Sequence, residues 1–254
     1  MRSVGSYRSW SCRAKFAGCG RDTSVRVRKP KGHGLLTPGQ VSILKGFAKL
    51  PDSDRFFLTG GTALAEFYLG HRLSFDLDLF TTEAGLVLPF SRLLETRFKD
   101  VGFQVRTVRR LTAFAEFILK VNDEEVRVQL AYDSPSRFHP PEETPLGKVN
   151  DFVDLAVDKF LAFFGRAEPR DAVDLFFLLK EATLEELMEL APKKDSGFDP
   201  YWLARALQRV QEFPDEPERW PVEVLVPWDP CEIKTRFAHL SQAVLAGLRK
   251  GGKG

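Results

Sequence analysis

The sequence of 254 residues has few cysteines, little net charge and no long apolar run. No stretch approaches the roughly 18 apolar residues that a membrane-spanning helix needs, so no integral membrane protein is expected. The three cysteines, Cys12, Cys19 and Cys231, show neither the spacing of a metal site nor a disulfide framework. A reducing cytoplasm is therefore the expected location. With 43% hydrophobic residues the chain can build a sizeable core, which excludes a disordered chain.

The net charge of +2 averages two unlike parts. Residues 1–31 hold nine Lys or Arg residues against one acid, Asp22, so this head carries +8 and the rest carries −6. Three interpretations remain open: an arm that binds nucleic acid through its phosphates, an Arg-rich organelle transit segment, or an upstream extension that packs on nothing. The third is favoured, because clear folding signals begin only at Leu35.

From Leu35 onward the pattern predicts a mixed α/β region. Thr37 and Pro38 are typical of the N-cap and first residue of a helix. Beyond them the sequence predicts strands over 56–59, 74–80, 103–109, 113–121 and 125–132, helices over 62–69 and 90–100, and a hairpin at 122–124. A proline-rich connector over roughly 134–146 ends this half.

The remainder is helical in pattern, and its stretch rich in Pro and Trp, about 214–230, is expected to fold back irregularly over the helices. Helices are predicted over 151–165, 170–181, 184–191, 200–212 and 231–249. Most of the 22 phenylalanines fall at positions typical of packing rather than of base stacking. We therefore expect an α+β (mixed α/β) chain in three parts: a basic, disordered extension (1–34), an α/β core with a mixed sheet and flanking helices (35–148), and a helical C-terminal domain (149–254).

Two aspartates in the predicted strand 74–80 carry the clearest chemical signal. Residues i and i+2 of a strand share a face, so Asp76 and Asp78 point one way while Leu77 and Leu79 point to the core. Neighbouring carboxylates repel each other unless a cation lies between them. Mg²⁺ takes such oxygen ligands, often together with the phosphates of a substrate.

A phosphate-binding signal precedes the aspartates. Gly60 and Gly61 let backbone N–H groups approach a phosphate without a Cβ in the way. A helix that begins at Thr62 would direct its positive N-terminus at the same anion. Each feature alone is weak. In this order, a strand, a Gly-Gly turn, a helix and an Asp-x-Asp strand predict a site for a triphosphate and a metal.

This combination resembles the nucleotidyltransferase (polymerase-β-like) superfamily. Leu58-Thr-Gly-Gly-Thr-Ala-Leu-Ala, His71-Arg72, Ser74 and Asp76-Leu-Asp78-Leu-Phe more closely resemble the AbiEii/AbiGii-type toxin family. Leu155-Ala-Val-Asp-Lys159, Arg166 and Arg170-Asp171-Ala-Val-Asp174-Leu support the same resemblance, which spans roughly residues 35–190.

The resemblance implies a nucleotidyltransferase fold and a Mg²⁺-dependent transfer (one or two ions) of a nucleotide from an NTP. It also implies a toxin of a toxin–antitoxin or phage-defence pair, with a cognate antitoxin and with tRNA or another RNA end as acceptor. The implied catalytic residues are Asp76, Asp78, Lys159 and Asp171, the first two as metal ligands. The implied nucleotide contacts are Gly60, Gly61, Thr62, His71, Arg72, Ser74, Arg166, Arg170 and Asp174.

Residue chemistry alone leaves several of these roles open. A lysine near an apolar helix face, as Lys159 is, either extends to solvent or points into a cleft to hold phosphate. His71 could donate to a phosphate or cap a helix, and Arg166 and Arg170 could form a structural ion network or line the cleft. Asp171 is favoured over Asp174 as the second-half acid, although the sequence does not separate them.

One departure from the superfamily pattern concerns the third carboxylate that many of its members carry on a later strand. Gln129 stands in the apt strand here, and a neutral amide cannot accept a proton. Glu125 shares its face and could substitute. Gln129 supports one alternative, an inactive module that senses nucleotides or binds proteins. A second alternative is that the same site transfers AMP or phosphate to a protein hydroxyl.

Overall fold

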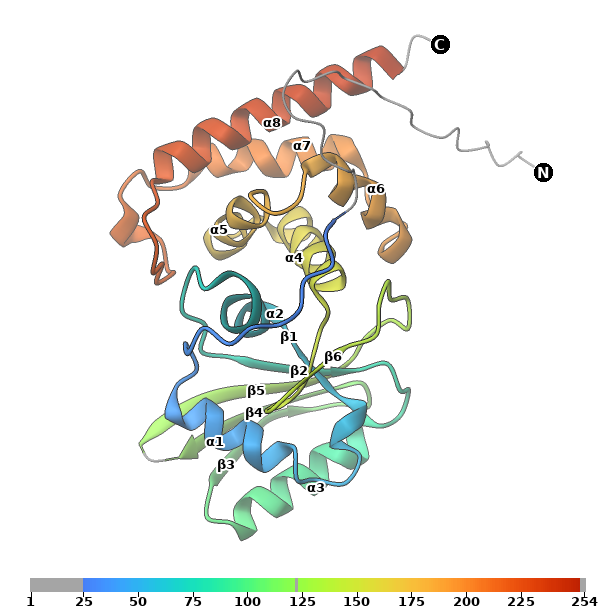
Figure 1. Ribbon diagram of the computed structural model, residues 1–254, viewed down its shortest axis with the longest axis vertical. Coiled ribbons are helices and arrows are strands. Elements are labelled where there is room, and N and C mark those ends of the chain that lie inside the picture. The colour runs from blue at the N-terminus through green and yellow to red at the C-terminus, as the bar shows by residue number, and fades with distance from the viewer. Residues whose placement is uncertain (1–24, 122, 252–254) are drawn as a thin grey trace, which may run out of the picture.

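The computed structural model describes residues 25–121 and 123–251 (Figure 1). Most of the basic head, with Cys12 and Cys19, lies outside the described residues, as does the possible arm or transit segment at 1–24. Within the described part of the chain, none of the helices combines the length and apolar content required to span a membrane.

A seven-stranded mixed sheet forms the first half, in the order β3-β4-β5-β2-β1-β7-β6. The strands are β1 (Phe57–Thr59), β2 (Leu77–Thr81), β3 (Gln104–Arg110), β4 (Phe114–Val121), β5 (Glu124–Tyr132), β6 (Glu142–Thr144) and β7 (Gly147–Val149). In the centre of the sheet, β2 pairs antiparallel with β1 and parallel with β5. This places the end of β1 and its Gly-Gly turn beside the start of β2.

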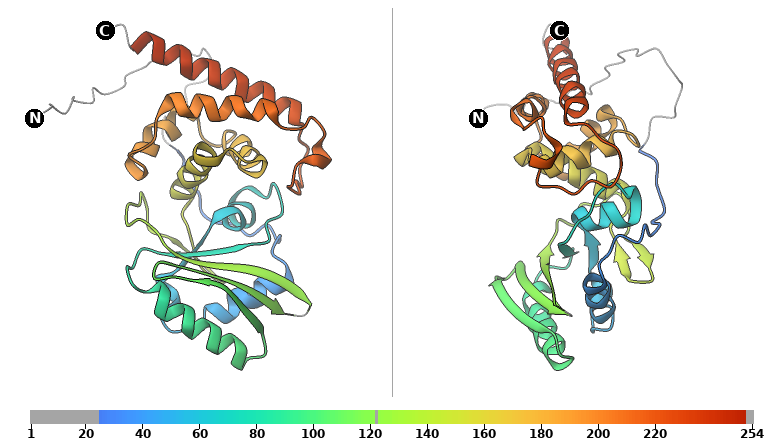
Figure 2. Two further views of the ribbon diagram at one scale, coloured as in Figure 1. Left: turned by 180° about the vertical axis from the view of Figure 1, so that it is seen from behind. Right: turned by 90° about the vertical axis from the view of Figure 1, so that its left-hand side faces the viewer.

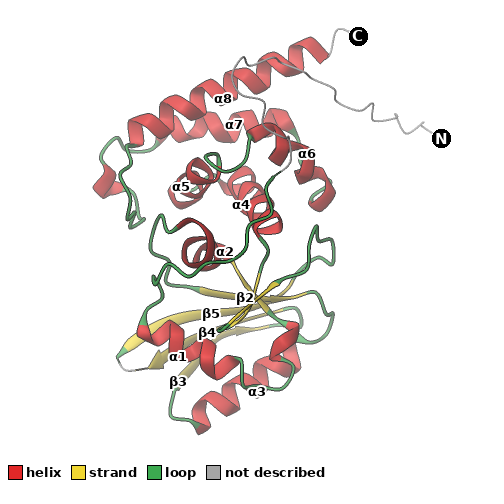
Figure 3. Ribbon diagram, viewed as in Figure 1, coloured by secondary structure: helices red, strands yellow, loops and turns green. Residues whose placement is uncertain are grey.

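Two helices cover the face of the sheet that lies away from the helical half (Figures 1 and 3). They are α1 (Pro38–Phe47) and α3 (Val87–Asp100). Thr37 caps α1 as predicted, accepting a hydrogen bond from the backbone N–H of Gln40. On the other face, α2 (Gly60–Leu64) and the π-helical turn Ala65–Leu69 lie between the sheet and the helices that follow.

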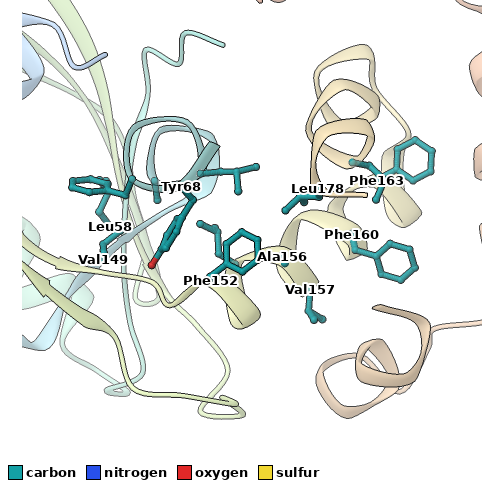
Figure 4. Packing of buried hydrophobic residues seen from close by; sticks show 14 of the residues in the cluster. Leu58, Tyr68, Val149, Phe152, Ala156, Val157, Phe160, Phe163 and Leu178 are labelled. Atoms are coloured by element: carbon teal, nitrogen blue, oxygen red, sulfur yellow. The ribbon is translucent and has the colours of Figure 1, made fainter. Parts of the chain in front are cut away.

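The helical half contains α4 (Phe152–Arg166), α5 (Pro169–Leu178), α6 (Leu184–Lys194), α7 (Pro200–Arg209) and α8 (Pro230–Gly251). Its apolar core is continuous with that of the sheet (Figure 4). Leu58 and Val149 of the sheet, Tyr68 beside α2, and Phe152 and Phe160 of α4 belong to one buried cluster. The division into domains at residues 148 and 149 stays a prediction.

Three element boundaries differ from the sequence-based prediction. The strand expected over 74–80 begins only at Leu77, because side chains rather than a neighbouring strand bond the carbonyls of Ser74 and Asp76. The helix expected over 62–69 begins at Gly60, whose φ of +73° turns the chain directly out of β1. The connector expected over 134–146 contains β6 and the turn into β7. Both strands have only three residues, which is too short to show an alternating pattern.

Residues 25–34 pack against the rest of the protein, so the expectation that the whole head packs on nothing is wrong for this segment. Val25 is buried, and the N–H groups of Lys31 and His33 donate to the carbonyls of Phe67 and Glu66. The carboxylate of Glu66 also accepts from the backbone N–H groups of Gly34, at 3.1 Å, and of Leu35. This segment is therefore held along the turn that follows α2.

Candidate functional site

The Gly-Gly turn lies in close contact with the loop and strand that carry the aspartates. A Cβ at Gly60 would collide with the carboxylate of Asp78. A Cβ at Gly61 would collide with the guanidinium of Arg72 and would lie 2.8 Å from the hydroxyl of Ser74. Glycine is required at both positions because no side chain fits there.

Asp76 and Asp78 flank the first residue of β2. Leu77 and Leu79 are buried in the core, as the alternation predicted. Asp78 is the register partner of Thr59 on β1, and it faces the Gly-Gly turn. Asp76 lies just before the strand, where the hydroxyl of Thr62 donates to its backbone carbonyl. Its side chain is 40% exposed, so it faces the open side of the site.

A buried ionic cluster lies across from these aspartates, where α4 and α5 face the turn. Asp174 is fully buried and accepts from Arg72 Nε at 2.6 Å and from Arg72 Nη2 at 3.0 Å. Lys159 Nζ lies 3.0 Å from its Oδ2, and His71 Nε2 lies 2.8 Å from its Oδ1. Burial alone would raise the pKa of Asp174, but Arg72, Lys159 and His71 outweigh burial and hold that pKa well below its ordinary value.

His71 contacts a carboxylate, which is neither of the two roles considered for it from the sequence. Burial lowers the pKa of its ring, and the hydrogen bond to Asp174 only partly offsets that effect. The ring is therefore neutral near pH 7 and donates to Asp174 through Nε2–H. Arg72 is likewise buried and fixed on Asp174, and it also donates to the carbonyl of Leu73.

The structure separates the two acids that the sequence left unresolved. Asp174 contacts Lys159, whereas Asp171 is held by Arg166 through two hydrogen bonds of 2.6 and 2.7 Å. Arg170 pairs with Glu168 at 3.0 Å and is about half exposed. Arg166 thus forms the ion pair within the helical half that was one of its two predicted roles.

The electrostatic surroundings of Asp78 show which side chains converge on it. Burial raises the pKa of its carboxyl, Lys159 lowers it, and Asp76 raises it further. Arg170 and Arg166 also lower this pKa, so both face the same region. The site therefore joins two aspartates from the sheet with three cations from the helical half.

These aspartates fit a divalent cation as part of its ligand set. Over residues 25–121 and 123–251, no group of three or more His, Cys, Asp or Glu side chains is arranged to hold a metal. Asp76 and Asp78 nevertheless supply two hard oxygen donors beside each other, and Mg²⁺ commonly takes one or two carboxylates and completes its shell with water and substrate phosphates. Burial and the neighbouring Asp76 both disfavour the charged form of Asp78. A cation bound between the two carboxylates would offset this unfavourable electrostatic energy.

The position predicted for a third carboxylate is occupied by Gln129. It is the direct register partner of Asp78 on β5. Glu125 lies beyond the start of β2 and pairs with Lys120 of β4 instead, so it does not reach the aspartates through the sheet register. Sequence reasoning missed Glu116, the partner of Gln129 on β4, whose carboxylate lies 3.5 Å from Arg127 Nε. Only the order of the strands in the sheet places Glu116 in line with Gln129 and Asp78.

The fold and the site together define the class. A mixed sheet that sets a Gly-Gly turn against an Asp-x-Asp strand has the architecture of a nucleotidyltransferase. An H. pylori protein assigned as a nucleotidyltransferase superposes with a TM-score of 0.54 and 16% identity, covering 85% of this chain and 98% of that chain. JHP933 from Helicobacter pylori superposes with a TM-score of 0.51 and 20% identity, covering 83% and 90%. At these identities the likeness shows the fold, and the expected fold class is confirmed.

The family follows from the sequence. The family model described as nucleotidyl transferase AbiEii toxin, Type IV TA system, matches residues 42–221, and the chain belongs to this family. The resemblance drawn from the motifs is thereby confirmed. MenT4, a nucleotidyltransferase toxin from Mycobacterium tuberculosis H37Rv, has a TM-score of 0.48 and 17% identity over 82% of this chain and 86% of that chain. A search among curated proteins finds no match.

Proposed function

We propose that this chain transfers a nucleotide from an NTP to an acceptor, in a Mg²⁺-dependent reaction. The observation that carries the proposal is the convergence of Asp76, Asp78 and Lys159 around the Gly60–Gly61 turn. Membership of a nucleotidyltransferase toxin family supports the reaction class.

Each residue of the site has a distinct proposed role. Asp76 and Asp78 would hold one or two Mg²⁺ ions, which when bound polarise the α-phosphate and neutralise the departing pyrophosphate. The backbone of Gly60, Gly61 and Thr62 would face the triphosphate. Lys159 would stabilise the negative charge that develops on the phosphates, because a fixed ammonium in a water-poor site needs no reorganisation during the reaction.

The Asp174 contacts change the proposed role of several predicted nucleotide ligands. His71 and Arg72 are buried and committed to Asp174, so we infer that they position Asp174 and, through it, Lys159. Ser74 contributes a backbone carbonyl that accepts from Gln40 Nε2 at 2.9 Å and thereby shapes the loop before Asp76. Arg166 and Arg170 are the more exposed cations, and they remain proposed phosphate contacts.

The acceptor proposed for this reaction is the end of a tRNA or of another RNA, and the proposed partner is a cognate antitoxin. Both rest on the family, which is that of a type IV toxin–antitoxin system. The acidic balance of the chain outside its head offers RNA no general attraction, so recognition must come from local contacts. Transfer of AMP or phosphate to a protein hydroxyl is the second candidate. Gln129 in place of a carboxylate supports the remaining alternative, an inactive module that senses nucleotides or binds proteins.

The test is a transfer assay with NTPs labelled at either the α- or the γ-phosphate, with and without tRNA, in Mg²⁺ or in a chelator. Label from the α-position on tRNA, lost in the chelator, is the expected result. Label on protein would establish the second candidate, with the α-label marking nucleotide transfer and the γ-label marking phosphate transfer. Nucleotide binding with no transfer to either acceptor would show an inactive module and overturn the proposal.

Toxicity is tested separately by expression in cells. We expect growth arrest with the wild-type chain and normal growth with the Asp76→Asn, Asp78→Asn double variant at equal protein level. Arrest by both would show that toxicity does not depend on the proposed chemistry.

A further inference from the structure

The segment between α7 and α8 returns to the loop that precedes the metal-binding aspartates. The N–H of Leu73 donates to the carbonyl of Glu223 at 2.8 Å, and the N–H of Leu225 donates to the carbonyl of His71 at 2.9 Å. Arg72 and Val224 form the antiparallel bridge between these bonds. Figures 1 and 2 show this connector descending from the two terminal helices to the loop after α2. The sequence predicted that it would fold back over the helices, and it reaches the sheet half as well.

The two segments enclose a cavity of about 370 Å³ that opens beside Asp76. Such a volume lies within the range of small-molecule sites, roughly 300–1,000 Å³. Phe75 and Asp76 line it from the loop, Pro221 and Glu223 line it from the connector, and Arg170 lines it from α5. Asp76 and Arg170 also belong to the proposed active site, so the cavity continues that site.

Among the phenylalanines that the structure describes, Phe75 is unusual because the residue is 54% exposed. The backbone on both sides of it is fixed, since the carbonyl of Ser74 accepts from Gln40 and the carbonyl of Asp76 accepts from Thr62. The ring is therefore displayed at a defined place, where a flat apolar partner would cover it. Because the ring lines the cavity beside Asp76, a flat apolar partner bound there would bury it and gain the corresponding hydrophobic free energy.

The other lining groups have the chemistry that a nucleotide requires. Nucleobases stack on aromatic rings, and a carboxylate such as that of Glu223 accepts hydrogen bonds from amino and imino groups on a base edge. Arg170 lines the same cavity and is near enough to Asp78 to lower the pKa of that carboxyl, and its guanidinium can hold a phosphate. The cavity thus carries the apolar, acceptor and cationic groups that a base and its phosphate require.

We propose that this cavity is a nucleobase-binding subsite in which Phe75 stacks on the base and Glu223 contacts its edge. The inference rests on the proposed nucleotidyl transfer, and it adds the residues that select the base. The base belongs to the incoming NTP or to the RNA end, since both supply the same ring chemistry beside Asp76.

Binding measurements on the full chain test this directly. The probes are an NTP analogue with a methylene bridge between its α- and β-phosphates, titrated with Mg²⁺, and a short single-stranded RNA. Phe75→Ala is expected to weaken one of the two by about tenfold, which is within the range for loss of base stacking. Weaker binding of the analogue assigns the base to the NTP, and weaker binding of the RNA assigns it to the acceptor.

Two variants distinguish stacking from a general structural effect. Phe75→Trp keeps an aromatic face and is expected to bind within about twofold of the wild type. Trp202→Ala removes another exposed aromatic, 62% exposed and placed on α7, and is expected to leave both affinities unchanged. Unchanged binding in Phe75→Ala, equal losses in Phe75→Ala and Phe75→Trp, or no binding of either probe to the wild type would overturn the proposal.

The role of Glu223 is tested by the choice among bases. Glu223→Gln replaces a group that only accepts by one that also donates, so the ratio of affinities for the four analogues should change severalfold. An unchanged ratio would remove Glu223 from the subsite. Because these are binding measurements, a wild type that binds but transfers nothing would contradict the proposed function and leave the subsite standing.

Discussion

Two buried ionic clusters lie along α4, and they have opposite charge balances. The cluster on one side of the helix, here the Asp174 cluster, consists of His71, Arg72, Lys159 and Asp174. The cluster on the other side, here the Asp154 cluster, consists of Arg137, Asp151, Asp154, Asp158 and Lys194. The first faces Asp78, and the second joins α4 to α6 and to the loop before β6.

The difference in balance explains why only one cluster is suited to an anion. In the Asp174 cluster, one carboxylate faces two permanent cations and a neutral histidine, which leaves positive charge toward the Gly-Gly turn. In the Asp154 cluster, three carboxylates share two cations. Burial and the neighbouring Asp154 raise the pKa of Asp151 to about 8, so this pair retains a proton at neutral pH. We propose that the first cluster serves phosphate binding and that the second serves stability.

The largest expected effect is on catalysis, from Asp78→Asn. The variant removes one of the two carboxylates proposed for the metal, and transfer should fall by about 10³-fold or more. Because burial raises the pKa of Asp78, the neutral amide should leave thermal stability unchanged or higher. Steady-state transfer and thermal unfolding measure the two effects.

Asp158→Asn is the matched control, because Asp158 precedes Lys159 on α4 but belongs to the other cluster. Its transfer rate should stay within about tenfold of the wild type. Equal losses in the two aspartate variants would contradict the separation of the clusters.

Replacing each of the two buried lysines by methionine should affect different properties: transfer for Lys159 and unfolding free energy for Lys194. Lys159→Met should slow transfer by about 10²–10³-fold, the usual cost of losing one charge-stabilising donor. Lys194→Met leaves Asp154 and Asp158 without their shared cation and should cost about 3–5 kcal/mol of unfolding free energy. Transfer per folded molecule should remain close to wild type. Denaturant unfolding and transfer kinetics are measured on both variants. Slow transfer in Lys194→Met, or a large loss of unfolding free energy only in Lys159→Met, would contradict this assignment.

The pH dependence of stability distinguishes the clusters at acid pH. The pKa of His71 is lowered from 6.5 in the folded state, so the unfolded chain binds more protons below that pH. The contribution of His71 to stability should therefore fall as pH drops below 6.5, by at most about 1.4 kcal/mol per pH unit. Asp151 of the other cluster contributes in the opposite direction, because its raised pKa means that the folded chain binds that proton more tightly than the unfolded chain does. The depressed pKa of Asp174 adds a further loss at lower pH.

His71→Gln isolates this contribution, because the amide keeps a donor for Asp174 but does not titrate. The unfolding free energy at pH 7.5 minus that at pH 5.0 should be less positive in the variant than in the wild type. An equal difference in both proteins would mean that His71 is not the titrating group.

The smallest expected effect concerns Asp151. Its side chain caps α4 by accepting from the N–H groups of Val153 and Asp154. Asp151→Ala should cost about 1 kcal/mol of unfolding free energy at pH 7. Asp151→Asn keeps the capping oxygen and needs no proton, so its cost should be only a few tenths. Similar costs for the two variants would show that the proton held by this pair matters more than the cap.

The fold was largely predictable because its signals are periodic. Alternating apolar residues predicted β4 and β5 within a residue at each end, and the spacing over 151–165 predicted α4 within one residue. β6 and β7 were missed because strands of three residues show no period. The packing of residues 25–34 was missed because it depends on backbone bonds to the turn after α2, which composition does not reveal.

The candidate site was predictable in its local parts and not in its long-range pairing. Gly60, Gly61, Asp76 and Asp78 lie within one short stretch, so spacing alone indicated that they meet. The partner of Lys159 is Asp174, and only the packing of α4 on α5 decides this over Asp171. The contribution of residues 221–225 was invisible for the same reason, since it pairs with residues about 150 positions earlier through its backbone.

The charge surplus of the Asp174 cluster is most directly tested by calorimetric titration of a Mg²⁺–NTP analogue into the wild type, Lys159→Met and Lys194→Met. Both lysines are buried on carboxylates, and they differ in which cluster they serve. The wild type and Lys194→Met should bind with the same Kd, and Lys159→Met should bind at least about tenfold more weakly. Equal weakening in the two variants, or full affinity in Lys159→Met, would contradict the account.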